Sequence, residues 1–240
     1  MLHRFLKLFL DTFFPWKCIS CKKEVRLSYP LCKKCKRGIP INHYFICPVC
    51  NKRITNFSKR SCFCKTYINA LGIVSFYQNS IIRKTIHFFK YQQIISLQKP
   101  LSDLMIKFLR ETSLFSEIDK KNILLIPIPL HKRKRRKRGF NQSELLTKNI
   151  AISLSLNFHS AILLRIKNNS PQAKINNFIK REKNVKNIFQ ISKSNLKIIK
   201  DKWIILIDDV YTSGATMQEA AKTLKKHGAK KVIGLALARG

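Results

Sequence analysis

Apolar and polar residues alternate after residue 65 in a pattern typical of strands that are separated by helices. Short apolar runs predict buried strands at residues 71–77, 122–129, 161–166, 204–207 and 232–238. Apolar residues spaced three and four apart predict helices at residues 81–91, 97–110, 143–156, 181–189 and 217–227, and residues 168–177 form a polar loop. Because strands and helices alternate, the pattern predicts an α/β fold with a parallel sheet.

The N-terminal segment, residues 1–16, combines basic residues with apolar residues at helical spacing. The apolar positions are Leu2, Phe5, Leu6, Phe9 and Phe13. Asp11 interrupts the segment and no small-residue cleavage site follows, so a signal peptide is not expected. We expect a helix that packs on the body, with weak membrane affinity as the alternative. No run reaches the ~18 apolar residues needed to span a bilayer, and we expect a cytoplasmic protein.

The charge of the chain changes this picture most. The 240 residues include 48 Lys and Arg against 12 Asp and Glu, a formal net charge of +36. A biased genome can replace Arg by Lys, but it does not explain the shortage of acidic residues. Such an excess favours polyanions, either nucleic acid or phosphorylated ligands, with strongly salt-dependent binding.

Eight cysteines, all within the first 64 residues, form closely spaced pairs. The pairs are Cys18 and Cys21, Cys32 and Cys35, Cys47 and Cys50, and Cys62 and Cys64. Each pair can offer thiolates to one side of a tetrahedral Zn²⁺ ion, so the spacing predicts two zinc sites. With cysteine at all ligand positions neither site has an open position, and both zinc ions are expected to be structural.

Sequential grouping is the expected arrangement of these cysteines, with the first four on one zinc and the last four on the other. Interleaved grouping is the alternative. A disulfide framework is disfavoured because nothing points to export, and an iron–sulfur cluster because the spacing differs from the usual runs. The sequence thus predicts a small domain at residues 1–66, formed by the N-terminal helix and a double zinc ribbon, before a larger domain at residues 67–240.

A run of basic residues follows the strand predicted at residues 122–129. It comprises His131, Lys132, Arg133, Lys134, Arg135, Arg136, Lys137 and Arg138, and Gly139, Phe140, Asn141 and Gln142 close it. The carboxyl ends of parallel strands form the ligand edge of an open α/β sheet. The position therefore favours a polyanion site over a solvated charge run.

A second candidate site lies at residues 204–216, which read I-I-L-I-D-D-V-Y-T-S-G-A-T. The adjacent acids Asp208 and Asp209 follow where the strand is expected to end. The hydroxyl-rich turn before the next helix consists of Thr212, Ser213, Gly214, Ala215 and Thr216. Gly214 permits close backbone approach to an anion, and the N–H groups and dipole of the helix favour one. The acids suit sugar hydroxyls or a divalent cation; the alternative is an ordinary capped helix beside a chance acidic pair.

This segment resembles the phosphoribosyl-pyrophosphate (PRPP) signature of type I phosphoribosyltransferases. The resemblance implies that Asp208 and Asp209 hold the ribose hydroxyls and that residues 212–216 hold the 5′-phosphate, with Mg²⁺ accompanying PRPP. Tyr211 is bulkier than the aliphatic residue usual at its position.

The order of motifs along nearly the whole chain is similar to that of the ComF family, which includes the GntX-type proteins. The motifs are the cysteine pairs, P-I-P-L-H-K-R-K-R-R-K-R-G-F-N-Q, L-L-R-I-K, P-Q, R-E-K-N and the PRPP signature. The family joins a double zinc ribbon to a phosphoribosyltransferase-like domain. The resemblance implies that the site is lined by Arg138, Gly139, Phe140, Asn141 and Gln142, and further by Arg165, Gln172, Arg181 and Asn184. Residues 169–172 depart from the family, which often has a Thr near the Pro-Gln pair.

Three functions follow from this resemblance. The first is a DNA-handling protein for DNA uptake or utilisation (competence). It would bind PRPP and single-stranded DNA, stack bases on Phe57, Phe63 and Tyr67, and have a DNA-uptake or helicase protein as a partner. The second is a phosphoribosyltransferase that acts with PRPP–Mg²⁺ on an unidentified base. The third is an interaction module whose pocket is a relic. No base-recognition motif is readable, which leaves enzyme activity open.

Overall fold

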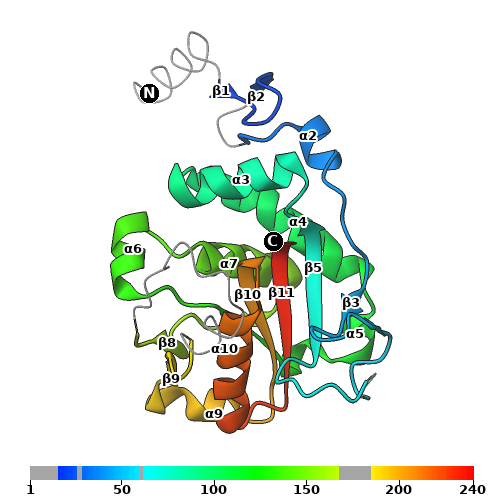
Figure 1. Ribbon diagram of the computed structural model, residues 1–240, viewed down its shortest axis with the longest axis vertical. Helices are drawn as coiled ribbons and strands as arrows, with labels where there is room; N and C mark the ends of the chain where they lie inside the picture. Colours follow the sequence, from blue (N-terminus) through cyan, green and yellow to red (C-terminus); the bar gives the residue numbers. More distant parts are fainter. Residues whose placement is uncertain (1–15, 26–28, 60–61, 168–184) are drawn as a thin grey trace.

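The computed structural model describes residues 16–25, 29–59, 62–167 and 185–240. The N-terminal helix predicted at residues 1–16 and the polar loop predicted at residues 168–177 lie almost entirely outside these ranges. Within them the chain forms a mixed α/β structure around a mostly parallel sheet (Figure 1).

The central sheet has the strand order β4-β3-β5-β11-β10-β6-β7. Its parallel strands are β5 (Ala70–Phe76), β6 (Ile123–Pro127), β7 (Asn157–Phe158), β10 (Trp203–Tyr211) and β11 (Lys231–Arg239). β10 lies between β11 and β6, and its residues 203–207 are buried on both faces, as a near-continuous apolar run predicts. The carboxyl end of β10 therefore opens at the middle of the ligand edge.

Helices cover both faces of this sheet (Figure 1). One face carries α3 (Ser80–Tyr91), α4 (Gln98–Glu111), α5 (Leu114–Glu117) and α7 (Gln142–Leu154). The other face carries α10 (Ala215–Lys226), α9 (Leu196–Ile199) and the hairpin of β8 (Leu163–Arg165) and β9 (Phe189–Ile191). Short 3₁₀ turns lie at Ile95–Leu97, Lys120–Asn122 and Lys193–Asn195.

The cysteine-rich region divides between two places. Strands β1 (Trp16–Lys17) and β2 (Glu24–Val25) form a separate sheet next to α2 (Lys33–Arg37). Strands β3 (Phe45–Ile46) and β4 (Arg53–Ile54) instead extend the central sheet, where β3 pairs antiparallel with β5. The domain boundary after residue 66 stays a prediction.

The strands and most of the helices expected from the pattern are present, with small changes of boundary. Three features differ. β10 does not end before the acidic pair but continues through it to Tyr211. The basic run forms a helix, α6 (Lys132–Arg138), because His131 caps its start and Gly139, at φ 76°, ends it. The helix predicted at residues 181–189 is wrong over its described part, which is a turn leading into β9. No helix in the described ranges is long and apolar enough to cross a membrane.

Candidate functional site

The two acids sit in the last part of β10, where neighbouring elements fix the first of them. Asp208 Oδ1 accepts hydrogen bonds from Ser143 Oγ at 3.1 Å and from the Asp209 backbone N–H at 2.9 Å. Ser143 lies in the first turn of α7. The N-terminal end of α7 therefore holds the Asp208 carboxylate at the ligand edge of the sheet.

Asp209 forms an ion pair with a lysine that the sequence analysis did not identify. Lys90 Nζ lies 2.7 Å from Asp209 Oδ1, and the two side chains are 16% and 9% exposed. Lys90 is in the last turn of α3, which the fold places next to the end of β10. It is a single charged residue within F-F-K-Y, and no motif marks it; only its place among apolar residues could have suggested a buried partner.

Burial and mutual repulsion govern the charge of this pair. Burial raises the pKa of Asp208 to about 7, and the charge of Asp209 adds to that increase. Lys90 and the hydrogen bonds from Asp209 and Ser143 oppose the shift. Burial also works to lower the pKa of Lys90, but attraction to the two acids outweighs it and leaves this pKa above its ordinary value. Lys90 thus stays charged, while Asp208 can change its protonation near neutral pH.

The helical form of the basic run separates its residues into two sets. Lys134 and Arg138 are part-buried, one turn apart, while Lys132, Arg133, Arg135, Arg136 and Lys137 are exposed. Burial lowers the pKa of Lys134, and the charges of Arg165 and Arg138 lower it further. Arg138 also opposes the increase in the pKa of Lys90. We call Lys134 and Arg138 the inward set, which adjoins Arg165 and Lys90. The five exposed residues are the outward set, which is available to a large polyanion.

The residues that close the basic run mainly position their neighbours. Asn141 is 6% exposed; its Oδ1 accepts from the Ser143 N–H at 3.2 Å and its Nδ2 donates to the Ile128 carbonyl at 3.1 Å. Gln142 Oε1 accepts from Arg138 Nη1 at 3.1 Å. Asn141 was predicted to bind an anion directly, but the structure turns it inward as the cap of α7. Gln142 orients the Arg138 guanidinium.

The hydroxyl-rich loop leads into α10 as predicted. Gly214 is the N-cap of α10 with φ 75°, and no side chain in the described residues caps this helix. The first N–H groups of α10 are therefore open to an anion. Gly214 has a second reason to be glycine, because an added Cβ would collide with the ring and hydroxyl of Tyr211. The large Tyr211 side chain, 6% exposed, thus packs under the loop.

One of the other predicted site residues lies within the described ranges, and three lie outside them. Arg165, at the end of β8, is part-buried, and its Nε has no hydrogen-bond partner among the described residues. Burial lowers the pKa of Arg165, against the attraction of Asp208. Arg165 therefore belongs to the same group of charges as the acidic pair. Gln172, Arg181 and Asn184 lie outside the described residues.

The eight cysteines form two groups in the sequential arrangement. Within each group, of Cys18, Cys21, Cys32 and Cys35 or of Cys47, Cys50, Cys62 and Cys64, the sulfur atoms lie within 4.8 Å of one another. We name the first set cluster 1 and the second set cluster 2.

Both clusters are built on the same backbone turn. In cluster 1 the Lys22 N–H donates to the Cys18 carbonyl at 2.9 Å, and in cluster 2 the Asn51 N–H donates to the Cys47 carbonyl at 3.0 Å. Lys22 and Asn51 both have positive φ, 64° and 59°. A tetrahedral ion with Zn–S bonds of ~2.3 Å needs sulfur atoms roughly 4 Å apart, and the Cys21 and Cys32 sulfurs are 3.7 Å apart. Both clusters fit a metal ion bound by thiolates.

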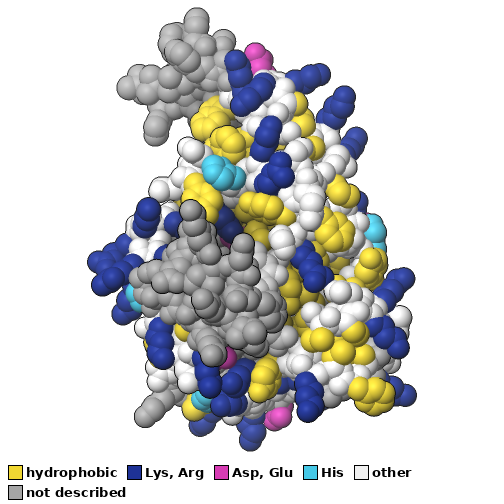
Figure 2. Space-filling view, in the orientation of Figure 1, with side chains coloured by type: hydrophobic (Ala, Val, Ile, Leu, Met, Phe, Trp, Pro, Cys, Tyr) yellow, Lys and Arg dark blue, Asp and Glu magenta, His cyan; other side chains and the backbone are white. Residues whose placement is uncertain are grey.

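The aromatic residues proposed to stack bases are not equally accessible. Phe57 is 4% exposed and packs edge-on against Phe45, with 5.1 Å between ring centroids. It is therefore a core residue. Phe63 and Tyr67 are 101% and 43% exposed and remain available. Figure 2 shows Lys and Arg side chains across most of the visible face, with acidic side chains at only a few points.

Comparisons with known proteins identify a matching family model and several related proteins. A family model described as phosphoribosyl transferase domain matches residues 143–240, which include α7, β10 and α10. Competence protein F of Haemophilus influenzae is 27% identical over 223 residues, covering 92% of this chain and 90% of that protein. Competence protein ComFC of Bacillus subtilis is 30% identical over 223 residues, covering 88% and 78%. DNA utilization protein YhgH of Escherichia coli K12 is 25% identical over 224 residues, covering 84% and 93%.

Proposed function

The chain belongs to the ComF family, and on that premise we propose that it binds PRPP and single-stranded DNA in the cytoplasm during DNA uptake or utilisation. The observation that carries the PRPP part is the acidic pair beside an uncapped helix N-terminus, with two cations that interact with the acids and two more that adjoin those cations. The cations are Lys90, Lys134, Arg138 and Arg165.

The acidic pair has carboxylate oxygens that are available to accept hydrogen bonds from a sugar. Lys90 occupies Oδ1 of Asp209, and Ser143 and a backbone N–H occupy Oδ1 of Asp208. Among the described residues, the Oδ2 atom of each acid has no hydrogen-bond partner. These oxygens can accept hydrogen bonds from the ribose hydroxyls of PRPP. Mg²⁺ bound with PRPP would supply positive charge that offsets the phosphate charges.

The phosphate groups of PRPP have matching partners on either side of the acids. The open N–H groups of α10 and the hydroxyls of Thr212, Ser213 and Thr216 suit the 5′-phosphate. Lys134, Arg138 and Arg165 suit the pyrophosphate, because Arg165 interacts with Asp208 and the charges of Arg165 and Arg138 both act on Lys134.

The double change Asp208→Asn with Asp209→Asn tests this site. Each lost charge-assisted hydrogen bond removes ~1.5–3 kcal/mol, so calorimetry with Mg²⁺ should show PRPP affinity falling at least about ten-fold. Asp201→Asn is the matched control, since Asp201 lies in an exposed turn before β10. Equal PRPP affinity in the double variant and the control would show that the acids do not bind PRPP.

The melting temperature measured as a function of pH shows whether a change at Asp208 lowers PRPP affinity by removing a ligand contact or by destabilising the fold. The pKa of Asp208 is raised to about 7 in the folded protein, above the ~3.9 of an unfolded chain. The ionised carboxylate is therefore disfavoured by folding, and stability falls as pH rises from about 4 to about 7. Asp208→Asn should remove this loss and raise the melting temperature above pH 7 but not near pH 4. A lower melting temperature at pH 8 would contradict the burial argument.

DNA binding is proposed for the outward set of α6, for which the observation is five exposed cations on a single helix. Arg133→Gln, Arg136→Gln and Lys137→Gln together should weaken binding of single-stranded DNA. Each lost phosphate contact should lower the slope of log K against log salt by ~0.7, similarly for unrelated sequences. PRPP affinity should not change.

The inward set supplies the matched comparison. The double change Lys134→Gln with Arg138→Gln should lower the affinity for PRPP and leave most of the affinity for DNA. If the outward variant retains full DNA affinity and salt slope, the DNA contact of α6 is excluded.

Zn²⁺ is the metal proposed for both clusters, because each offers four cysteine sulfur atoms that lie within 4.8 Å of one another, and Zn²⁺ prefers four thiolate ligands. Bound zinc would tie the two halves of each cluster together and leave no position for substrate. Metal analysis of the purified protein should give about two zinc ions per chain. Intact disulfides without metal would overturn this assignment.

Catalysis is a second candidate, favoured by the match of residues 143–240 to a phosphoribosyl transferase domain. A transferase would release pyrophosphate from PRPP through a transition state stabilised by the surrounding cations. Incubation with PRPP, Mg²⁺ and a panel of bases, with detection of pyrophosphate, separates transfer from binding alone.

A further inference from the structure

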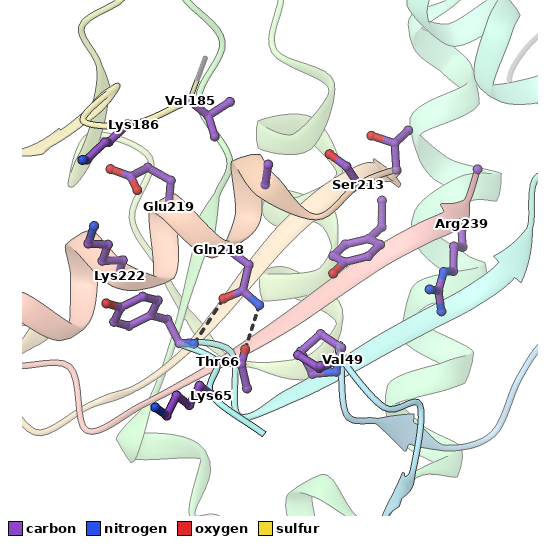
Figure 3. Close-up of a pocket in the computed structure, with 16 residues that line it drawn as sticks. Val49, Lys65, Thr66, Val185, Lys186, Ser213, Gln218, Glu219, Lys222 and Arg239 are labelled. Atoms are coloured by element: carbon purple, nitrogen blue, oxygen red, sulfur yellow. Dashed lines mark hydrogen bonds between the residues drawn. The ribbon is translucent and has the colours of Figure 1, made fainter. Parts of the chain in front are cut away.

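A groove of about 1040 Å³ runs along α10 (Figure 3). α10 contributes Gln218, Glu219 and Lys222, which lie on one side of the helix. The opposite wall comes from residues 65–67 and from the end of β11. We call this feature the α10 groove.

The α10 groove is strongly basic. Among the residues that the structure describes, its lining includes Lys65, Lys186, Lys222 and Arg239 against a single acid, Glu219. Glu219 is 9% exposed, and its Oε1 already accepts the Asn187 N–H at 2.7 Å. The charge that the groove presents to a ligand is therefore positive, as a polyanion site requires.

An aromatic ring stands in the same groove. Tyr67 is 43% exposed, and Lys222 Nζ lies 6.0 Å from its ring centroid. Gln218 fixes this part of the wall, since its Oε1 accepts the Tyr67 N–H at 3.1 Å and its Nε2 donates to Thr66 Oγ1 at 2.7 Å (Figure 3). The ring is thus a pre-positioned surface with cations beside it, suited to stacking a base.

The groove joins two features described above. Thr212 and Ser213 of the hydroxyl-rich loop line it, and so do Pro48 and Val49 of the turn in cluster 2. Arg239 connects these features: its Nη1 donates to Asn51 Oδ1 at 2.8 Å, and its guanidinium lies 6.0 Å from the Tyr211 ring centroid. A strand lying in the groove would reach from cluster 2 to the phosphate loop.

We propose that the α10 groove is a binding site for single-stranded nucleic acid, with a base stacked on Tyr67 and backbone phosphates near Lys65, Lys186 and Lys222. This site rests on the proposed DNA binding and is distinct from the outward set of α6. Duplex is disfavoured, because its bases are already stacked and paired and cannot present a face to Tyr67.

Tyr67 gives the sharper of two tests. Binding of a short fluorescein-labelled oligodeoxythymidine is measured by anisotropy for the full chain and for Tyr67→Phe and Tyr67→Leu. Phenylalanine keeps the ring, so Tyr67→Phe should bind within about two-fold of the unmodified chain. Tyr67→Leu should lose affinity about ten-fold, as expected for one lost stacking contact. Equal loss in both variants, or loss in neither, would overturn the stacking role.

Charge is tested with a variant matched in number and type. Lys65→Ala, Lys186→Ala and Lys222→Ala together should flatten the salt slope by about 2, at ~0.7 per phosphate contact. The control is Lys84→Ala, Lys148→Ala and Lys197→Ala, three exposed lysines outside the groove. An equal decrease in the control would mean that net charge alone matters and would overturn the groove site.

The outcomes separate this inference from the proposed function. If the unmodified chain binds no oligonucleotide, the proposed DNA binding fails as well. If the outward α6 variant loses binding and the groove variants do not, only the α10 groove is excluded. If a polyglutamate peptide competes as well as oligodeoxythymidine in the unmodified chain and in Tyr67→Leu, the groove binds acidic polymers in general and the nucleic-acid assignment is wrong.

Discussion

Clusters 1 and 2 share one local design but are attached to the molecule in different ways. Each begins with the same hydrogen-bonded turn and a residue of positive φ after the second cysteine. Cluster 1 lies with its own small sheet at one end of the molecule, whereas the strands of cluster 2 belong to the central sheet (Figure 1). The comparison indicates that the contribution of a cysteine cluster to stability depends on the strands that it holds in place, and not on its ligands alone.

Packing around Phe45 makes the difference concrete. Phe45, on β3 between the two halves of the cysteine region, is 1% exposed and lies 5.0 Å from the Phe108 ring and 5.1 Å from the Phe57 ring. It faces Gly72 of β5, where an added Cβ would come within 2.8 Å of both Phe45 and Phe108. Cluster 1 is joined to α4 by an ion pair, Lys36 Nζ to Asp103 Oδ2, at 2.5 Å, and its neighbours Ile19 and Leu31 belong to the same apolar core, but its strands do not pair with the central sheet.

The largest expected contrast is between Cys47→Ser and Cys18→Ser. Losing a ligand of cluster 2 should release β3 and β4 and lower the free energy of unfolding of the whole protein by about 4 kcal/mol. Losing a ligand of cluster 1 should open residues 18–35 and leave the main transition within about 1 kcal/mol. Denaturant unfolding followed by Trp203 fluorescence in a Trp16→Phe background, with hydrogen exchange of residues 18–35, measures both. Equal destabilisation by the two variants would mean that both clusters are coupled to the main unfolding transition to the same extent.

A smaller contrast concerns glycines near each cluster. Gly72→Ala should destabilise by ~1–3 kcal/mol, because the new methyl group would press on the Phe45 and Phe108 rings. Gly38→Ala, beside cluster 1, should be neutral or slightly stabilising, since the nearest atoms to its Cβ are 3.5 Å away and φ is −75°. Thermal unfolding of both variants checks this. A Gly72→Ala protein as stable as Gly38→Ala would contradict the close packing at β3.

The smallest effect should come from Asp103→Asn, which breaks the ion pair between cluster 1 and α4. The two side chains are 29% and 33% exposed, so the pair should contribute no more than ~1 kcal/mol, and less at high salt. Hydrogen exchange of residues 33–37 at low and high salt is the measurement. Protection that falls by more than about ten-fold at low salt would show that the ion pair holds cluster 1 in place more firmly than its exposure suggests.

Much of the fold could be predicted because its signals are local. Runs such as residues 204–207 are buried on both faces and mark central strands, and residues 98–111 carry a regular apolar face. The extension of β10 through Asp208 and Asp209 could not be predicted, because polar residues at a strand end look like a loop. Pairing supplies the missing information: Asp208 is opposite Ala236 of β11, and Tyr211 is opposite Arg239.

In the candidate site, too, the features with local sequence signals could be predicted and those that depend on tertiary packing could not. The acids and the hydroxyl-rich loop are adjacent in sequence and were identified together. Lys90 lies more than a hundred residues before Asp209, and only the packing of α3 brings it within 2.7 Å. Asn141 was placed in the site by the family resemblance and Phe57 by its aromatic ring, but in the structure Asn141 caps α7 and Phe57 is part of the core. A sequence motif gives the chemistry of a residue, while the direction of its side chain depends on the tertiary fold.

The place of β3 has a consequence for protein quality in the cell. β5 reads A-L-G-I-V-S-F, an uncharged segment of high β-propensity of the kind that assembles into aggregates when its edge is bare. In the folded chain β3 covers its first half, and Asn42 covers the next stretch by donating to the carbonyls of Ile73 and Val74. Oxidation of the cluster 2 thiols would release β3 and expose the edge of β5. A fault in one small cysteine group would then turn a working protein into a template for self-association.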